Sequence, residues 1–113
     1  MTGAAQTKYK QQARIIKALA HPTRLFIVDE LARGERSVRE LTDMIGVEMP
    51  TVSRHLSVLR NAGILADDKR GLQVFYRLRV PCVLNFFKCV EAVQSDSRKP
   101  ANRIVSSKTG CAT

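Results

Sequence analysis

The segment TVSRHLSVLRNAGIL, residues 51–65, decides how this sequence folds. Val52, Leu56 and Leu59 recur at the spacing of one helix face, so we expect a helix with these three side chains buried. A histidine and two arginines share the same short helix. The helix could therefore be an ordinary core helix, part of a metal site, or a helix that contacts another molecule.

The sequence before this segment predicts three more helices. Residues 8–20 have apolar side chains at helical spacing, and a second helix is expected to start at Pro22, which suits a first helical turn. Ser37 and Glu40 have the spacing of a capping box at the start of a third helix, which Gly46 ends. The short link after Gly46 makes the third and fourth helices a helix–turn–helix pair.

The sequence after this segment changes to strand periodicity. Residues 72–79 alternate in character and contain aromatic and β-branched side chains, and residues 67–71 form a polar turn, so a hairpin is expected. Pro81 is expected to open a last helix, which is apolar around most of its circumference. Such a helix must be buried against more than its own small domain, which suggests a subunit interface.

These elements predict a mainly α fold with a small β-hairpin, the winged helix–turn–helix, in a homodimer. A chain of 113 residues has room for one domain. We expect residues 1–7 to form a flexible N-terminus and residues 8–94 to form a winged helix domain for DNA binding and dimerisation. Residues 95–113 are expected to form a flexible basic tail.

The charge of the chain favours a polyanionic partner. The net charge is +9, and a bound polyanion relieves the self-repulsion of such a chain. Residues 25–48 hold six acids and three bases, whereas residues 49–79 hold six bases and two acids. No apolar run is long enough to span a membrane, and the N-terminus lacks a secretory signal, so we expect a cytoplasmic protein with no membrane partner.

The second helix of a helix–turn–helix pair lies in the DNA major groove, and the wing adds contacts beside it. Arg can pair with guanine, and Ser and Thr can bond base edges or phosphates. His55 could orient a neighbouring side chain or contact a phosphate, and Arg60 is placed at the rim, where phosphate contact is expected. The candidate DNA-binding residues are Thr51, Ser53, Arg54, His55, Ser57 and Arg60 on the helix, with Lys69 and Arg70 on the wing.

Four motifs together resemble the ArsR/SmtB family of bacterial metal- and stress-responsive repressors. They are HPTRL from residue 21, V-x-x-L-x-x-x-I-G from residue 38, T-V-S-R-H-L-x-x-L-x-x-A-G from residue 51, and G-x-x-V-x-Y-x-L from residue 71. The resemblance covers residues 8–94. It implies a homodimer, joined by the first and last helices, that binds an inverted-repeat DNA operator and releases it when an inducer binds.

Two inducer sites of this family are absent here. Ser37 and Arg39 occupy the positions of the family's C-x-C arsenic and cadmium site, and the last helix has no histidine for the family's zinc and nickel site. Cys82, Cys89 and Cys111 remain as candidate metal ligands. Three thiolates suit trivalent arsenic or antimony, which we expect as the inducer.

One regular helix cannot bring Cys82 and Cys89 onto a single ion. Seven residues separate them, which is about 10.5 Å along a helix axis. Sulfurs that share a metal lie within about 4 Å of each other. A shared site therefore requires a second subunit or a contribution from Cys111.

Other functions stay open. A dithiol–disulfide or reactive-sulfur switch would use the same cysteines, which could also be inert buried side chains. A DNA-binding protein without an effector would have the same charge and fold, and an RNA-binding winged helix is a further alternative. We do not expect an enzyme, because the sequence has no Ser–His–acid set, phosphate loop or catalytic metal motif. DNA binding itself is expected to need no cofactor.

Overall fold

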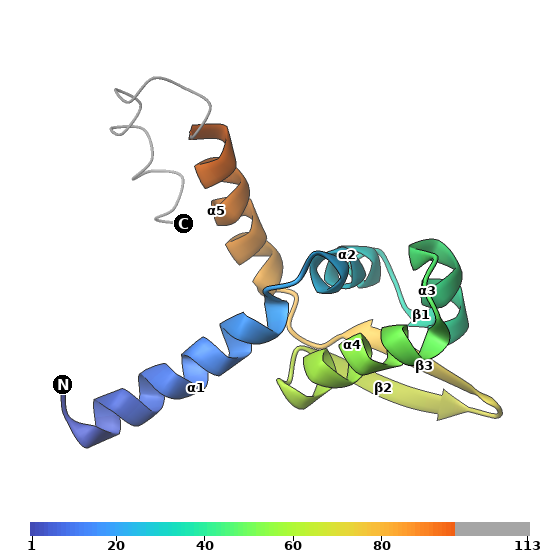
Figure 1. Cartoon of the computed structure of the whole chain (residues 1–113), viewed down its shortest axis with the longest axis horizontal. Coiled ribbons are helices and arrows are strands. Elements are labelled where there is room, and N and C mark those ends of the chain that lie inside the picture. The colour runs from blue at the N-terminus through green and yellow to red at the C-terminus, as the bar shows by residue number, and fades with distance from the viewer. Residues whose placement is uncertain (97–113) are drawn as a thin grey trace. The chain divides into compact units, whose positions relative to one another are not determined.

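The computed structural model describes residues 1–96 and divides into two units, Met1–Val80 and Pro81–Thr113. Figure 1 shows the helices and strands of both units. The first unit contains α1 (Gly3–Leu19), α2 (Pro22–Leu31), β1 (Arg36–Ser37), α3 (Val38–Ile45), α4 (Met49–Asn61), β2 (Leu65–Arg70) and β3 (Gln73–Leu78). The second unit contains α5 (Val83–Asp96). The predicted winged helix–turn–helix is confirmed: α3 and α4 form the helix pair, and β2 and β3 form the wing.

The first helix begins at Gly3, five residues earlier than predicted. The hydroxyl of Thr2 accepts a hydrogen bond from the backbone N–H of Ala5, which caps the helix at its true start. The apolar periodicity begins only later in the helix, so the pattern did not reveal the first turn. The expectation that residues 1–7 lie outside the regular structure is therefore wrong for residues 3–7.

The helix–turn–helix pair has the caps that the sequence predicts. Ser37 and Glu40 form a complete capping box, in which the Ser37 side chain accepts from the Glu40 N–H and the Glu40 carboxylate accepts from the Ser37 N–H. Hydrogen bonding with Ser37, mainly with its backbone N–H, lowers the pKa of Glu40 below its ordinary value. Gly46 ends α3 with a φ of 82°, a left-handed conformation that favours glycine.

A single apolar core lies beneath α4. Its most deeply buried side chains come from α2, α3, α4 and β2, and they are Ile27, Val28, Leu41, Val52, Leu56, Leu59 and Leu65. The predicted stripe of α4, Val52, Leu56 and Leu59, is fully buried. Burying three such side chains stabilises the helix in one orientation, with its opposite face toward solvent.

The wing is part of a three-stranded antiparallel sheet in the order β1–β3–β2. In the hairpin, Leu65 pairs with Leu78 and Arg70 pairs with Gln73. The two-residue β1, which the sequence pattern did not predict, pairs Ser37 with Phe75. It is too short to show a period of two, so only the folded sheet reveals it.

The last helix begins at Val83 and ends at Asp96, so Pro81 and Cys82 precede it. The prediction that the helix opens at Pro81 is wrong by two residues, because the turn before it is closed by hydrogen bonds from Leu84 N–H to Pro81 and from Asn85 N–H to Cys82. The predicted tail boundary at residue 95 falls within the helix, and its remainder lies outside the described residues. Among residues 1–96, no helix is both long and apolar enough to cross a membrane.

Candidate nucleic-acid interface

The outward face of α4 carries polar side chains that the fold leaves unengaged. Arg54 is exposed, and Thr51, Ser53 and Ser57 are half-buried at the helix surface. Within residues 1–96, none of these four side chains forms a hydrogen bond or an ion pair. Four predicted contact residues thus share a surface that is free to meet base edges or phosphates.

The N-terminus of α4 contributes its helix dipole to this face but few free donors, because Pro50 has no N–H and the amides of Thr51 and Val52 already donate to the Glu48 carbonyl. The N-cap residue, Glu48, forms no side-chain hydrogen bond to the helix, and Pro50 lies in the first turn. The first amides of a helix point along its axis and carry a partial positive charge. This partial positive charge favours a nearby DNA phosphate even where the amides are already bonded.

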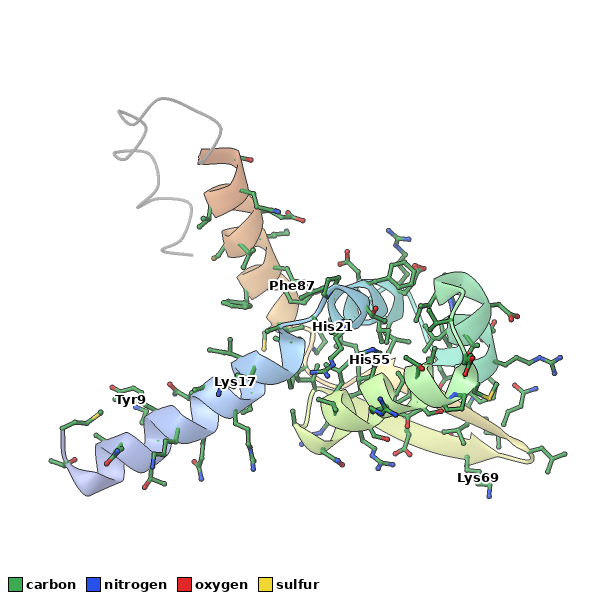
Figure 2. All side chains as sticks on the ribbon, viewed as in Figure 1. Tyr9, Lys17, His21, His55, Lys69 and Phe87 are labelled. Atoms are coloured by element: carbon green, nitrogen blue, oxygen red, sulfur yellow. The ribbon has the colours of Figure 1, made fainter. Side chains whose placement is uncertain are left out.

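His55 does not share the outward face of α4. It is buried, with 9% of its surface exposed, and its Nδ1 accepts a hydrogen bond of 3.0 Å from Nε of Arg24. Of the two roles considered for His55, the structure favours orientation of a neighbour over phosphate contact. Figure 2 shows His55 beside His21, and the two ring centroids are 4.5 Å apart.

Arg70 is held within the protein by several partners. Its Nη1 and Nη2 each lie 2.7 Å from a carboxylate oxygen of Glu35, and its Nε lies 2.9 Å from Asp68. The guanidinium also stacks on the ring of Phe75, with a distance of 4.7 Å to the centroid. The two carboxylates raise the pKa of Arg70 above its ordinary value. This two-pronged pair joins the wing to the loop before β1.

Arg60 is also paired, and it joins α4 to the wing. Its Nη1 lies 3.0 Å from the Asp67 carboxylate on β2. Tyr76 lies within the electrostatic reach of this pair, and burial raises its pKa above the ordinary value. Asp67 and Asp68 therefore hold Arg60 of α4 and Arg70 of the wing, which reduces the number of free cations that this surface offers to DNA.

Lys69 is the predicted wing contact that stays free. It lies on β2 and is exposed, and Figure 2 shows its side chain projecting from the hairpin. Within residues 1–96 it forms no ion pair or hydrogen bond. Of the eight predicted DNA-binding residues, the fold thus leaves five unpaired on the outer surface: Thr51, Ser53, Arg54, Ser57 and Lys69.

Two residues that support this surface were missed by sequence reasoning. Arg24 holds His55, and Glu35 holds Arg70. Each pair joins residues more than 30 positions apart, at separations of 31 and 35. Only Arg24 gave a signal, as part of the HPTRL motif, and nothing in that motif pointed to His55.

The cysteines do not form a metal site among the described residues. Cys82 is exposed in the turn before α5, and Cys89 is half-buried within α5. Cys111 lies outside the described residues. Within residues 1–96, no three His, Cys, Asp or Glu side chains come together in a way that could hold a metal ion.

Known bacterial regulatory proteins resemble this chain in sequence. The family model described as bacterial regulatory protein, arsR family, matches residues 21–67, from the start of α2 into β2. The chain is 42% identical over 73 residues to the biofilm growth-associated repressor of Xylella fastidiosa, a match that covers 65% of this chain and 64% of the relative. The match thus spans slightly less than two thirds of that relative's length.

Solved structures agree over most of the chain. The crystal structure of the transcriptional repressor BigR from Xylella fastidiosa is 36% identical with a TM-score of 0.66, and the match covers 82% of this chain and 96% of that one. The solution structure of the homodimeric winged helix–turn–helix DNA-binding domain of Mb0332 from Mycobacterium bovis, a possible ArsR-family regulator, is 31% identical with a TM-score of 0.73, covering 85% of this chain and 89% of that domain. This chain therefore belongs to the ArsR family of bacterial regulatory proteins.

Proposed function

We propose that this protein is a dimeric transcriptional repressor that binds an inverted-repeat DNA operator through α4 and the wing. The observation that carries the proposal is the unpaired polar face of α4, with Arg54 exposed at its centre and two serines beside it. A guanidinium and hydroxyls are the groups that read base edges in the major groove. Lys69 is placed on the wing for phosphate or minor-groove contact. The related Xylella fastidiosa protein is a repressor, which supports this assignment.

The dimer is proposed from apolar side chains that a single chain leaves exposed. On α1 they are Tyr9, Ile15 and Ile16, and on α5 they are Phe86, Val90 and Val93. Each helix exposes several large apolar groups, and a second copy would cover such surfaces. The homodimeric state of the Mycobacterium bovis domain supports this arrangement. A dimer places two recognition helices about 34 Å apart, one turn of DNA.

The inducer is proposed to be a thiophilic species, with trivalent arsenic or antimony first. Cys82 offers an exposed thiol and Cys89 a half-buried one. Each cysteine thiol can replace one hydroxyl of arsenous acid, forming an As–S bond, and the thiol proton leaves with the hydroxyl as water. A second subunit or Cys111 would complete the set of three sulfurs. An inducer releases DNA only if it binds the DNA-free shape more tightly than the DNA-bound one.

Two experiments test these proposals in turn. Selection from a random duplex pool should return an inverted repeat, and fluorescence anisotropy should show tighter binding to that duplex than to its scrambled form. Equal affinity for both duplexes would instead indicate a general DNA-binding protein with no sequence preference and no effector, and equal competition by RNA would indicate an RNA-binding role.

The second experiment adds arsenite under reducing conditions to the wild type and to Cys82→Ser, Cys89→Ser and Cys111→Ser. Release of operator from the wild type, with resistance in one or more variants, identifies the ligands. If arsenite has no effect, the metalloid proposal fails. The same titration with an oxidant or a persulfide then tests the thiol switch.

A further inference from the structure

Three polar side chains from α2 and the inner face of α4 form a cluster that lies away from the proposed DNA-binding face. His21 is the N-cap of α2, Arg24 lies one turn further along α2, and His55 lies in the middle of α4. The Nδ1 of His21 accepts a hydrogen bond of 3.1 Å from the Thr23 N–H. Figure 2 shows the two imidazoles beside each other, and His55 is buried whereas His21 is half-buried.

Arg24 connects α4 to the end of α1. Its Nε donates to Nδ1 of His55 at 3.0 Å, and its Nη1 donates to the carbonyl oxygen of Ala18 at 3.2 Å. Ala18 is buried in the last turn of α1. One guanidinium thus fixes the middle of the recognition helix against a helix whose apolar side chains are proposed to meet the second subunit.

This connection requires a neutral His55. Arg has only donors, so Nδ1 of His55 must present a lone pair, and the ring hydrogen must be on Nε2. His21 also uses Nδ1 as an acceptor, which requires the same tautomer. A proton on Nδ1 of His55 would remove the acceptor and place a cation directly against the guanidinium.

The surroundings of His55 all oppose this proton. Burial lowers the pKa of His55 below its ordinary value. The groups whose charges act on His55 are His21 and Arg24 from α2 and Arg54 from α4, and each lowers the pKa further. From α1, the cluster receives only the Ala18 carbonyl, which is already bonded to Arg24. A proton that does bind His55 therefore has no carboxylate partner among these groups.

We propose that the Arg24–His55 hydrogen bond, with His21 beside it, is a proton-sensitive joint that positions the recognition helix. In the neutral state the joint holds α4 against α1 and α2 in the orientation that reads DNA. Protonation of His55 breaks the hydrogen bond and loosens α4, so mild acidification weakens operator binding. This inference rests on the proposed DNA-binding function and makes His55 and Arg24 positioning residues for it.

The test compares operator binding of the wild type and His55→Asn across pH at constant ionic strength. Asn can keep an acceptor where Nδ1 lies, but it does not titrate. From about pH 8 to about pH 5.5, the wild type should lose about five- to tenfold more of its affinity than His55→Asn, each measured against its own value at the higher pH. Equal pH dependence in the two proteins would overturn the proposal.

A measurement without DNA separates the joint from the DNA-binding function. NMR titration of the wild type should show His55 protonating at lower pH than an exposed histidine, together with shifts of amide signals in α4 and in the last turn of α1. In His21→Asn, which can keep the N-cap acceptor, the His55 titration should move to higher pH, because Asn cannot become a second cation beside His55. Titration of His55 without changes in these amides would overturn the joint even if DNA binding is confirmed. Failure to bind any specific DNA would overturn the proposed function and leave these NMR outcomes to judge the joint.

Discussion

The recognition helix and the wing both carry arginines, but the fold uses them differently. On α4, Arg54 forms no ion pair or hydrogen bond within residues 1–96, whereas on the wing Arg70 is held by Glu35 and Asp68. Arg60 lies between the two regions and is paired with Asp67. The sign of a charge in the sequence therefore identifies a candidate contact, but only the folded partners decide whether that charge is free. On this comparison, we expect α4 to read the bases and Arg70 mainly to hold the wing in place.

Removing a buried apolar side chain of α4 should have the largest effect, because it destabilises the helix that carries Arg54. Leu56→Ala deletes a fully buried side chain and should lower the free energy of unfolding by about 2–5 kcal/mol. Leu72→Ala is the matched control, because Leu72 is fully exposed at the hairpin tip, and its effect should stay within about 0.5 kcal/mol. Urea unfolding followed by circular dichroism measures both. Similar losses in the two variants would contradict the core assignment.

Removing the free arginine of α4 should have the next largest effect. Arg54→Ala should weaken operator binding by about 1–3 kcal/mol and relax the preference at one base pair of each half-site. The thermal unfolding midpoint should stay near that of the wild type, because Arg54 is exposed. Arg14→Ala on α1 removes the same charge from another exposed position, unpaired within residues 1–96, and serves as the control. If the two variants lose affinity equally, Arg54 contributes only charge.

The paired and unpaired cations of the wing should differ in their salt dependence. Lys69→Ala should reduce the slope of log affinity against log salt by about one, as expected for the loss of one phosphate contact. Arg70→Ala should weaken operator binding with little change in that slope. This substitution removes the contact that holds the wing to Glu35 and does not remove a phosphate contact. Anisotropy titrations at several salt concentrations measure both slopes.

Glu35→Gln tests whether Arg70 positions the wing or contacts DNA, because the two roles predict opposite changes in operator affinity. The substitution removes an acid from a basic protein, so charge alone would strengthen DNA binding. If Glu35 holds Arg70 to position the wing, operator binding should weaken instead. Stronger binding would mean that the released Arg70 reaches DNA and that its pairing with Glu35 competes with that contact.

Acidification should remove the stability contributions of His55 on α4 and Glu40 on α3 in two separate pH ranges. We expect this to be the smallest of the effects. The pKa of His55 is lowered in the folded state, so its contribution to stability is complete above the unfolded value of 6.5 and is lost as pH falls below it. The pKa of Glu40 is also lowered, and its contribution is lost only as pH falls below 4.5. Unfolding measured across pH should show the first loss in the wild type and in Glu40→Gln, but not in His55→Asn. A first loss that persists in His55→Asn would assign it to another group.

The helix–turn–helix pair and the hairpin could be predicted because their signals are local. Ser37 and Glu40 are three residues apart, Gly46 supplies the left-handed turn, and Val52, Leu56 and Leu59 define one helix face. Each signal depends on neighbours within a turn or two, which sequence periodicity captures. The outward face of α4 follows from the same periodicity.

The partners of the site residues could not be predicted, because they are distant along the chain. Nothing near His55 indicates that Arg24 will donate to it, and nothing near Arg70 indicates that Glu35 will hold it. His55 and Arg70 were therefore predicted as DNA contacts, whereas in the fold both are held by partners within the protein. The start of α1 and the short β1 were missed for a different reason, since neither has enough apolar residues to show a period.

The most direct test is the ratio of affinities for the selected operator and its scrambled form in the wild type, Arg54→Ala and Arg70→Ala at one salt concentration. We expect the wild type to prefer the selected operator by at least about a thousandfold. That ratio should fall sharply in Arg54→Ala and stay close to the wild-type ratio in Arg70→Ala, even though both variants bind less tightly. A ratio that falls in Arg70→Ala and persists in Arg54→Ala would contradict the claim that α4 reads the bases while the wing arginine holds the wing.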